Sequence, residues 1–437
     1  MAKKRNKVSK LAMGIVLMMM LVFSMTIPAF AEEQPYAKGT ESTPADAAIT
    51  KRLVMPAGTT TPTTTFEFEF EKKSLDGYDG IADKAAMPPV ANATVEFTSA
   101  DVGSESGGIK TINKESEHLF KDVTWDRAGV YIYTVTELTT TFTNSFAEKV
   151  TYTEAVYDVA VYVDNKSDGS GVYIAAISAT IVAHDESNEG DDIGDKVDPT
   201  PGDMTVEVGD YSQMIFTNYY LKNNGGENPN DTVLSVSKEV SGMSANQEKY
   251  FPFSVVVSNP ATVIDDPQGP ATTYKAYVYD GATLVEDLSD YKNTAGANIK
   301  PDGNGIDYIV FESGSAITVN LKHGQWLSFI DLPVGSTFNV TESAVADYTA
   351  SYKLTLKGAL AGSESNQSDN ESLSIGVRYL SDSSVADSAA FTNAYQTIIP
   401  GGISVNNLPY YVLAALTLLA LSSYVVFKSR KRARSNA

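Results

Sequence analysis

The sequence predicts an all-β protein built from two β-sandwich modules in series. The middle of the chain consists of short runs in which apolar and polar positions alternate, such as "TFEFEFE", "GVYIYTVTE" and "YDVAVYV". Such alternation is typical of strands that bury one face. No long amphipathic helix is evident between the two ends of the chain. The order of these strand-like segments in the first half of the chain recurs in the second half, which indicates a repeated module.

Residues 1–31 have the features of a secretory signal peptide. Basic side chains come first, followed by the apolar run "LAMGIVLMMMLVFSM" and the small-residue motif "AFA". This order is typical of a segment that is cleaved, here after Ala31, once it has directed export. The alternative is an uncleaved anchor helix, which the short apolar run and the cleavage motif disfavour. We therefore expect an exported protein.

The body of the chain is acidic and contains no cysteine. The formal net charge is −21, and all 54 Asp and Glu side chains lie between residues 32 and 401. Such a surface repels nucleic acid and suits a solvated extracellular protein. The lack of cysteine excludes disulfides, thiol catalysis and cysteine-based metal sites. An exported protein of this composition needs another source of stability.

The sequence predicts no cofactor and no metal site. His118, His184 and His323 lie far apart in the sequence and in polar surroundings. The acidic stretch that begins at Asp185 approaches the spacing of an EF-hand calcium loop. However, Lys196 occupies the twelfth position, where such a loop needs a bidentate Glu. A solvated loop is the better interpretation of this stretch.

The two modules are predicted at residues 32–222 and 232–397, separated by the polar, turn-forming stretch "NNGGENPND" at 223–231. Three pairs of segments recur in the same order: "ITKRL" and "VSKEV", "GVYIYTVTE" and "GSTFNVTES", and "IFTNYY" and "AFTNAY". A lysine, a glutamate and an asparagine therefore recur on the first, a middle and the last strand. These residues are Lys51, Glu137 and Asn218 in the first module, and Lys238, Glu342 and Asn393 in the second.

These three residue types can form an amide bond if the fold buries them together. Burial lowers the pKa of a lysine and raises that of a glutamate, which favours a neutral amine and a protonated carboxyl. The amine of Lys51 could then attack the side-chain carbonyl carbon of Asn218 while Glu137 polarises the carbonyl oxygen and transfers protons. The alternative is that each Asn hydrogen-bonds its own turn and each Lys extends to solvent.

Other carboxyl groups compete for the role of the glutamate. Glu67, Glu69 and Glu71 lie on a nearby strand of the first half, and Glu312 lies in the second half. The shared "VTE" context favours Glu137 and Glu342.

The segments "DVTWDRAGVYIYTVTE", "LSVSKEVSG", "HGQWLSFIDLPVGSTFNVTE" and "AFTN" resemble Gram-positive pilins and surface proteins built from the streptococcal pilin isopeptide-linkage domain. The resemblance covers nearly all of the chain and implies two tandem Ig-like sandwiches. It implies that each triad forms a crosslink within its own module, in a single turnover. It does not imply an enzyme that acts on outside substrates.

The C-terminal region resembles the sorting signal of these pilins. A Pro-containing segment at 398–407 precedes an apolar stretch at 408–427, long enough for a transmembrane helix, and a basic tail at 428–437 that we expect to be cytoplasmic. Gly401 stands where the family has a threonine, and the resemblance implies cleavage by a sortase between Gly401 and Gly402. The alternative is a protein held only by its transmembrane helix.

We therefore predict a pilin subunit or pilin-like stalk on the surface of a Gram-positive bacterium, anchored to the cell wall or the membrane. Its expected partners are a sortase, other pilin subunits or peptidoglycan, and the membrane. The family places an acceptor lysine shortly before the "FTN" asparagine, and this chain has none there; Lys196 and Lys222 flank the stretch. The alternative is a stand-alone surface adhesin that binds a host protein or carbohydrate.

Overall fold

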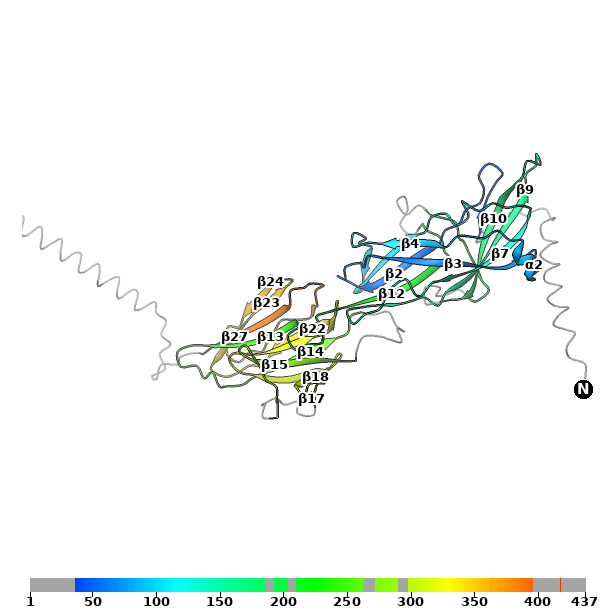
Figure 1. Ribbon diagram of the computed structural model, residues 1–437. Helices are drawn as coiled ribbons and strands as arrows, with labels where there is room; N and C mark the ends of the chain where they lie inside the picture. Colours follow the sequence, from blue (N-terminus) through cyan, green and yellow to red (C-terminus); the bar gives the residue numbers. More distant parts are fainter. Residues whose placement is uncertain are drawn as a thin grey trace, which may run out of the picture.

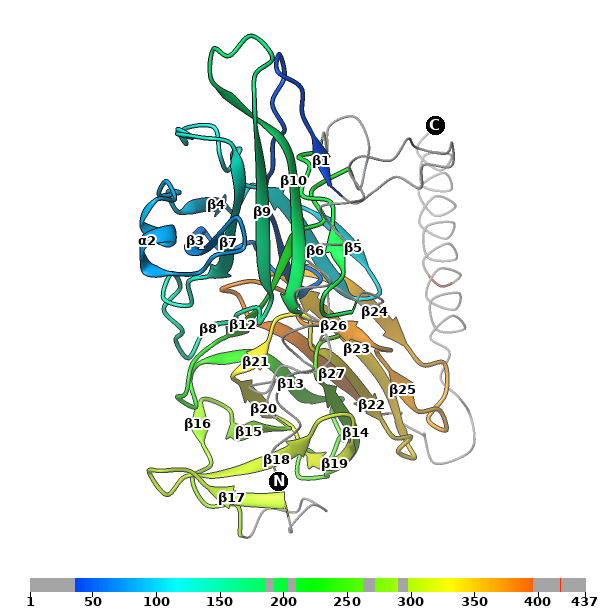
Figure 2. The same cartoon turned by 90° about the vertical axis from the view of Figure 1, so that its right-hand side faces the viewer.

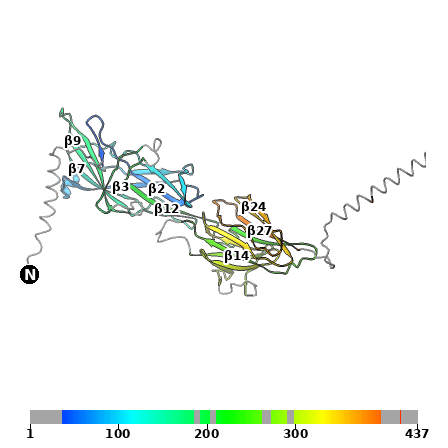
Figure 3. The same cartoon turned by 180° about the vertical axis from the view of Figure 1, so that it is seen from behind.

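The computed structural model describes residues 36–184, 192–202, 210–261, 272–289 and 298–395, together with residue 417. It shows two bodies of β-strands that follow one another along the molecule (Figure 1; Figure 3). The expected signal peptide, the sorting segment with Gly401 and Gly402, and the transmembrane segment apart from residue 417 lie outside the described residues. Within the described ranges, no helix is long and apolar enough to cross a membrane.

The first module is a sandwich of two sheets. One sheet has the strand order β1-β10-β9-β7-β3-β4, with β11 paired to β10. Its strands are β1 (Ala37–Lys38), β3 (Thr64–Leu75), β4 (Ala93–Phe97), β7 (Gly129–Glu137), β9 (Val156–Asn165), β10 (Val172–Ala183) and β11 (Lys196–Val197). A short helix, α2 (Ile81–Ala85), follows β3.

The facing sheet of the first module brings the first and last strands of the triad together. Its order is β12-β2-β6-β5, with β8 paired to β12. The strands are β2 (Thr50–Pro56), β5 (Ser104–Ser106), β6 (Ile109–Glu115), β8 (Glu148–Thr151) and β12 (Ile215–Asn224). β2 and β12 are parallel, with Lys51 opposite Phe216 and Leu53 opposite Asn218. Because side chains alternate along a strand, these four residues share one face.

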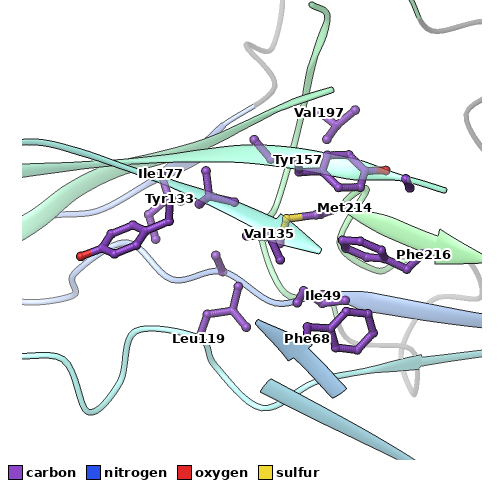
Figure 4. Close-up of a cluster of buried hydrophobic side chains, with 14 of the residues drawn as sticks. Ile49, Phe68, Leu119, Tyr133, Val135, Tyr157, Ile177, Val197, Met214 and Phe216 are labelled. Atoms are coloured by element: carbon purple, nitrogen blue, oxygen red, sulfur yellow. The ribbon is translucent and has the colours of Figure 1, made fainter. Parts of the chain in front are cut away.

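That shared face is the inner face of the sandwich. Ile49 directly precedes β2 and Phe216 lies on β12, and they meet Phe68, Val135 and Tyr157 from the facing sheet (Figure 4). All five of these side chains are buried. Burial of aromatic and branched side chains on this scale supplies the driving force for the fold.

The second module repeats this arrangement. Its larger sheet has the order β17-β18-β15-β20-β13-β27-β23-β24, with β16 on β15, and the facing sheet has the order β19-β14-β22-β25, with β26 on β22. The larger sheet contains β13 (Thr232–Ser241), β15 (Thr273–Asp280), β16 (Thr283–Leu284), β17 (Ile299–Pro301), β18 (Asp307–Glu312), β20 (Gln325–Ile330), β23 (Tyr348–Leu356), β24 (Ala359–Ser365) and β27 (Asp387–Tyr395). The smaller sheet contains β14 (Phe251–Ser258), β19 (Ala316–Leu321), β22 (Thr337–Glu342), β25 (Leu373–Ser374) and β26 (Arg378–Tyr379).

The pairing of the first and last strands has the same register in both modules. β13 and β27 are parallel, with Lys238 opposite Phe391 and Val240 opposite Asn393. In each module, therefore, the lysine faces a phenylalanine and the residue two positions later faces the asparagine. The prediction of an all-β chain with two sandwiches in series is confirmed.

The two modules meet through regular backbone pairing. The last two residues of β12, Asn223 and Asn224, pair with β21 (Leu332–Pro333) of the second module. Figure 2 shows β21 beside β12 where the modules come together. The turn between β12 and β13 falls within the stretch that the sequence indicates as a linker, 223–231.

Candidate crosslink sites

In the first module the carboxyl group of Glu137 lies between the two nitrogen atoms of the triad. Lys51 Nζ lies 2.7 Å from Glu137 Oε2. Asn218 Nδ2 donates a hydrogen bond of 2.7 Å to Glu137 Oε1. The side chains of Lys51 and Glu137 are almost fully excluded from solvent, and Asn218 is fully buried. One carboxyl group therefore contacts both the attacking and the departing nitrogen of the proposed reaction.

The carbonyl oxygen of Asn218 has a different partner. The backbone N–H of Thr153 donates a hydrogen bond of 2.8 Å to Asn218 Oδ1. A backbone N–H can only donate, so this contact sets which end of the side-chain amide faces Thr153. The geometry thus differs from the sequence expectation in one respect, because Glu137 faces the amide nitrogen of Asn218 and not its oxygen.

The second module brings its three residues together in the same way. Lys238 Nζ lies 2.9 Å from Glu342 Oε1, and both side chains are fully buried. The Asn393 side chain lies close enough to Glu342 to act on its pKa, and it is also buried. Glu342 Oε2 and Asn393 Oδ1 have no hydrogen-bond partner among the described residues. This site therefore holds two unsatisfied acceptors.

Burial drives the pKa values in the second site toward the reactive protonation states. Loss of hydration lowers the pKa of Lys238 to about 8, although the Glu342 carboxyl beside it partly opposes this effect. Loss of hydration raises the pKa of Glu342 above its ordinary value, and the Lys238 amine opposes that shift only in part. An apolar interior penalises any charged group, so a neutral amine beside a neutral carboxyl becomes accessible.

The local pattern of each strand explains why these polar groups point inward. On β7, the buried positions are Tyr131, Tyr133, Val135 and Glu137, so the glutamate occupies the last inward position. On β22, Phe338, Val340 and Glu342 follow the same rule. The glutamates come from the sheet that faces the lysine and asparagine, so each triad spans its sandwich.

The competing carboxyl groups point elsewhere. Glu69 and Glu71 are exposed on the outer face of β3, and Glu67 is half-buried and accepts a hydrogen bond from Asn92. Glu312 is exposed at the end of β18.

A pair of phenylalanines beside each lysine was missed by the sequence analysis. Lys51 Nζ lies 4.9 Å and 5.9 Å from the ring centroids of Phe66 and Phe68. Lys238 Nζ lies 4.3 Å and 5.9 Å from those of Phe251 and Phe253. The signal that could have revealed them is the shared F-x-F spacing on the strand next to the "VTE" strand. These rings surround each lysine, which is fully buried, with apolar groups.

The other residues singled out in the sequence lie outside the triads. Lys196 is exposed on β11, whereas Lys222 pairs with Asp382 at the module junction, 2.7 Å from Nζ to Oδ1. His118 lies beside Asp46, and His323 Nδ1 lies 3.0 Å from Glu239. In the part of the chain that the structure describes, no group of three metal-binding side chains is found.

Comparisons with known proteins match each module separately. Residues 47–221 match the family described as the Spy0128-like isopeptide containing domain, and residues 232–395 match a domain family of unknown function. A pilin from Streptococcus pyogenes serotype M1 is 25% identical over 393 residues, which cover 88% of this chain and 90% of that protein.

Among solved structures, the crystal structure of the major pilin from Streptococcus pyogenes is 18% identical, with a TM-score of 0.30. The match covers 81% of this chain and 100% of that one. A pilus-presented adhesin is 17% identical with a TM-score of 0.21, covering 55% of this chain and 36% of that one.

The protein is a structural, surface-exposed protein of the Gram-positive pilin class. Its first module, at residues 47–221, matches the family of Spy0128-like isopeptide containing domains.

Proposed function

We propose that this pilin-type protein is a stalk subunit that is stabilised by two self-formed intramolecular isopeptide bonds, Lys51–Asn218 and Lys238–Asn393. The observation that carries the proposal is the repeated site. Both modules bury a lysine, a carboxyl group and an asparagine together, on strands paired in the same register. Buried ionisable groups are costly for stability, and their repetition favours a chemical role over chance.

The reaction begins when the lysine gives its proton to the carboxylate beside it. In the first module, the neutral Nζ of Lys51 attacks the Cγ atom of Asn218. The protonated Glu137 donates a proton to the departing Nδ2 and takes one from the attacking nitrogen. The Cγ–Nδ2 bond breaks, ammonia leaves, and Glu137 ends protonated, with one proton more than the carboxylate had before Lys51 gave up its own.

The second module supports the same chemistry through its two unsatisfied oxygens. Glu342 Oε2 and Asn393 Oδ1 each lack a partner among the described residues. A charged carboxylate oxygen that is buried without a partner is unfavourable, so the site favours the protonated carboxyl. The raised pKa of Glu342 acts in the same direction.

The bonds tie the first strand of each module to its last strand. They close loops from residue 51 to 218 and from residue 238 to 393. By analogy with disulfides of such loop length, the chain-entropy gain is roughly 5 kcal/mol for each bond. That is comparable to the whole stability of an ordinary domain. A chain without cysteine gains in this way the covalent support that disulfides give to other exported proteins.

Intact mass of the recombinant residues 32–400 tests the proposal. We expect the measured mass to fall short of the calculated mass by two ammonia molecules, because each bond releases one. Glu137→Ala or Glu342→Ala should restore one ammonia mass each. The matched controls are Glu69→Ala and Glu312→Ala, which remove exposed carboxyl groups on β3 and β18 and should leave both deficits in place. A wild-type chain measured at its full calculated mass would contradict the proposed bond formation.

We further propose that residues 398–437 anchor the protein, by sortase cleavage between Gly401 and Gly402 or through the apolar segment at 408–427. The S. pyogenes relative that is named a pilin supports assembly with further pilin subunits or attachment to peptidoglycan. High-mass ladders in cell-wall extracts, resistant to boiling in detergent, are the expected result. A single monomer band would contradict polymerisation.

A further inference from the structure

The two sites differ at the carbonyl oxygen that becomes negatively charged during the attack. In the first module, Asn218 Oδ1 accepts a hydrogen bond from the backbone N–H of Thr153. In the second, Asn393 Oδ1 has no partner among the described residues. The proposed roles of lysine, glutamate and asparagine leave the Thr153 contact without a function.

Thr153 lies just beyond the point where the strand ladder stops. β8 pairs with β12 only as far as Thr151, which lies opposite Tyr219. Beyond that point Thr153 directs its N–H to the Asn218 side chain, while its hydroxyl accepts a hydrogen bond of 3.0 Å from the N–H of Ala155.

The preceding residue holds the segment in place. The Tyr152 hydroxyl accepts a hydrogen bond of 2.7 Å from the N–H of Phe142, and its ring packs edge-on against Phe66 at 6.2 Å. Phe66 also borders the Lys51 amine. The Thr153 donor is therefore held by the same core that holds the nucleophile.

A fixed donor at this oxygen stabilises the transition state. When Lys51 Nζ bonds to Asn218 Cγ, the carbonyl π electrons move to Oδ1, and the oxygen acquires negative charge. A donor already aimed at that atom stabilises the charge with little reorganisation, and the effect is strongest where water is excluded. On collapse, the electrons return to re-form the carbonyl as the Cγ–Nδ2 bond breaks.

We propose that the backbone N–H of Thr153 is a one-donor oxyanion hole for the self-crosslinking reaction of the first module, and that Glu137 acts there only as the proton carrier between the two nitrogens. This inference rests on the proposed crosslinking function. It has a consequence for the molecule: the first module closes its bond faster than the second, which has no donor at the equivalent oxygen among the described residues.

The test removes the N–H and nothing else. The full chain is made by cell-free translation with the α-hydroxy acid analogue of threonine at position 153, which replaces the backbone N–H by an oxygen. Proteolysis of samples taken over time, followed by mass spectrometry, gives the crosslinked fraction of each module. We expect the first module to react about 100-fold more slowly, the scale of losing one oxyanion donor, while the second module is unchanged.

Thr153→Ala is the matched control, because it keeps the N–H and removes the γ-methyl group and the hydroxyl that accepts from Ala155. It should react at the wild-type rate. Equal rates for the ester chain and the wild type would overturn the inference, and so would equal slowing of the ester and alanine chains. If the ester chain does not fold, the crosslinking rates of the two modules are compared in the wild-type chain. A second module that closes as fast as the first overturns the inference. Absence of ammonia loss from the wild-type first module would instead overturn the proposed function.

Discussion

A lysine that loses all contact with water must find an anionic partner or give up its proton. Lys238 has an anionic partner, because Glu342 lies beside it. Burial nevertheless lowers the pKa of Lys238 to about 8, so its proton is also easier to lose. The rings of Phe251 and Phe253 favour the charged amine through their π faces, but they also keep water out. The residue thus sits near the balance between ion pair and nucleophile, which is the state that bond formation requires.

A chain unable to form the second bond should show this balance in its pH dependence. In an Asn393→Ala chain, the unfolding free energy of the second module is expected to rise from about pH 8 toward the ordinary lysine pKa of 10.5. In that window the folded amine of Lys238 is neutral while the unfolded amine still binds a proton, so unfolding takes up a proton and becomes less favourable as pH rises. The pKa difference limits the gain to about 3 kcal/mol.

Urea unfolding followed by tryptophan fluorescence measures this gain. The chain has two tryptophans, so Trp125→Phe leaves Trp326 as the reporter of the second module. Lys238→Met, added to the same background, should remove the rise and leave only the contribution of other groups. An unchanged slope in the Lys238→Met chain would show that the pH dependence has another origin.

At the scale of elements, β12 has several functions along its ten residues. Its first half pairs with β2 and carries Asn218, its middle pairs with β8, and its end pairs with β21 of the second module. The strand that would carry the crosslink therefore continues directly into the module junction. A load leaving the first module passes into regular backbone pairing and not into a free linker.

Asp382 is the side chain that secures this junction. It is almost fully buried and accepts hydrogen bonds of 2.7 Å from Lys222 Nζ on β12 and 2.7 Å from the N–H of Thr60. Burial acts to raise its pKa, but the bonds from Lys222 and Thr60 outweigh that effect, and the pKa lies below the ordinary value of 3.8. One carboxylate thus binds two separate segments of the first module.

Replacing Asp382 with alanine should loosen the junction without unfolding either module. The loss of two charge-assisted hydrogen bonds leaves the Lys222 amine and the Thr60 N–H without their acceptor, at a cost of about 1–3 kcal/mol. Hydrogen exchange at Thr60 and at Val334, whose N–H donates to Lys222 O, is expected to become at least tenfold faster. Glu248→Ala, which breaks an exposed ion pair with Lys322, is the control. Unchanged exchange at both amides would mean that Asp382 does not hold the junction.

At the scale of the whole molecule, the proposed bonds place a covalent path along the body. Force that enters at β2 crosses to β12 through the Lys51–Asn218 bond, and force that enters at β13 crosses to β27 through the Lys238–Asn393 bond. The parallel pairing of these strands allows a single bond to link the first strand of each module to its last strand. Nearly all of each module then lies outside the loaded path.

Single-molecule stretching from the two ends of the body should therefore show no module unfolding in the wild type. Glu137→Ala removes the first bond, and its chain should release residues 51–218 in one step of about 57 nm, at roughly 3.4 Å per residue. Glu342→Ala should give a step from the second module alone. The Glu69→Ala control should extend like the wild type. Full unfolding steps in the wild-type chain would be incompatible with covalent closure.

Much of this molecule could be predicted from local pattern. Alternation of period two reports which face of a strand is buried, and the inward positions of Glu137 and Glu342 agree with it, because each ends a run of alternating apolar residues. The repeated order of lysine, glutamate and asparagine indicated the triads. The phenylalanines of β3 and β14 read simply as core, since an F-x-F pattern does not state which polar group it surrounds.

The sequence by itself determined the all-β class, the two modules and the residue types of both triads, because these depend on short-range periodicity and on repetition. Only the tertiary structure decided that β2 and β12 lie side by side in parallel, that each glutamate comes from the facing sheet, and that Thr153 rather than Glu137 faces the Asn218 oxygen. These features are contacts between residues far apart in the chain. They are set by how two sheets pack and where a ladder ends, and no local pattern records either.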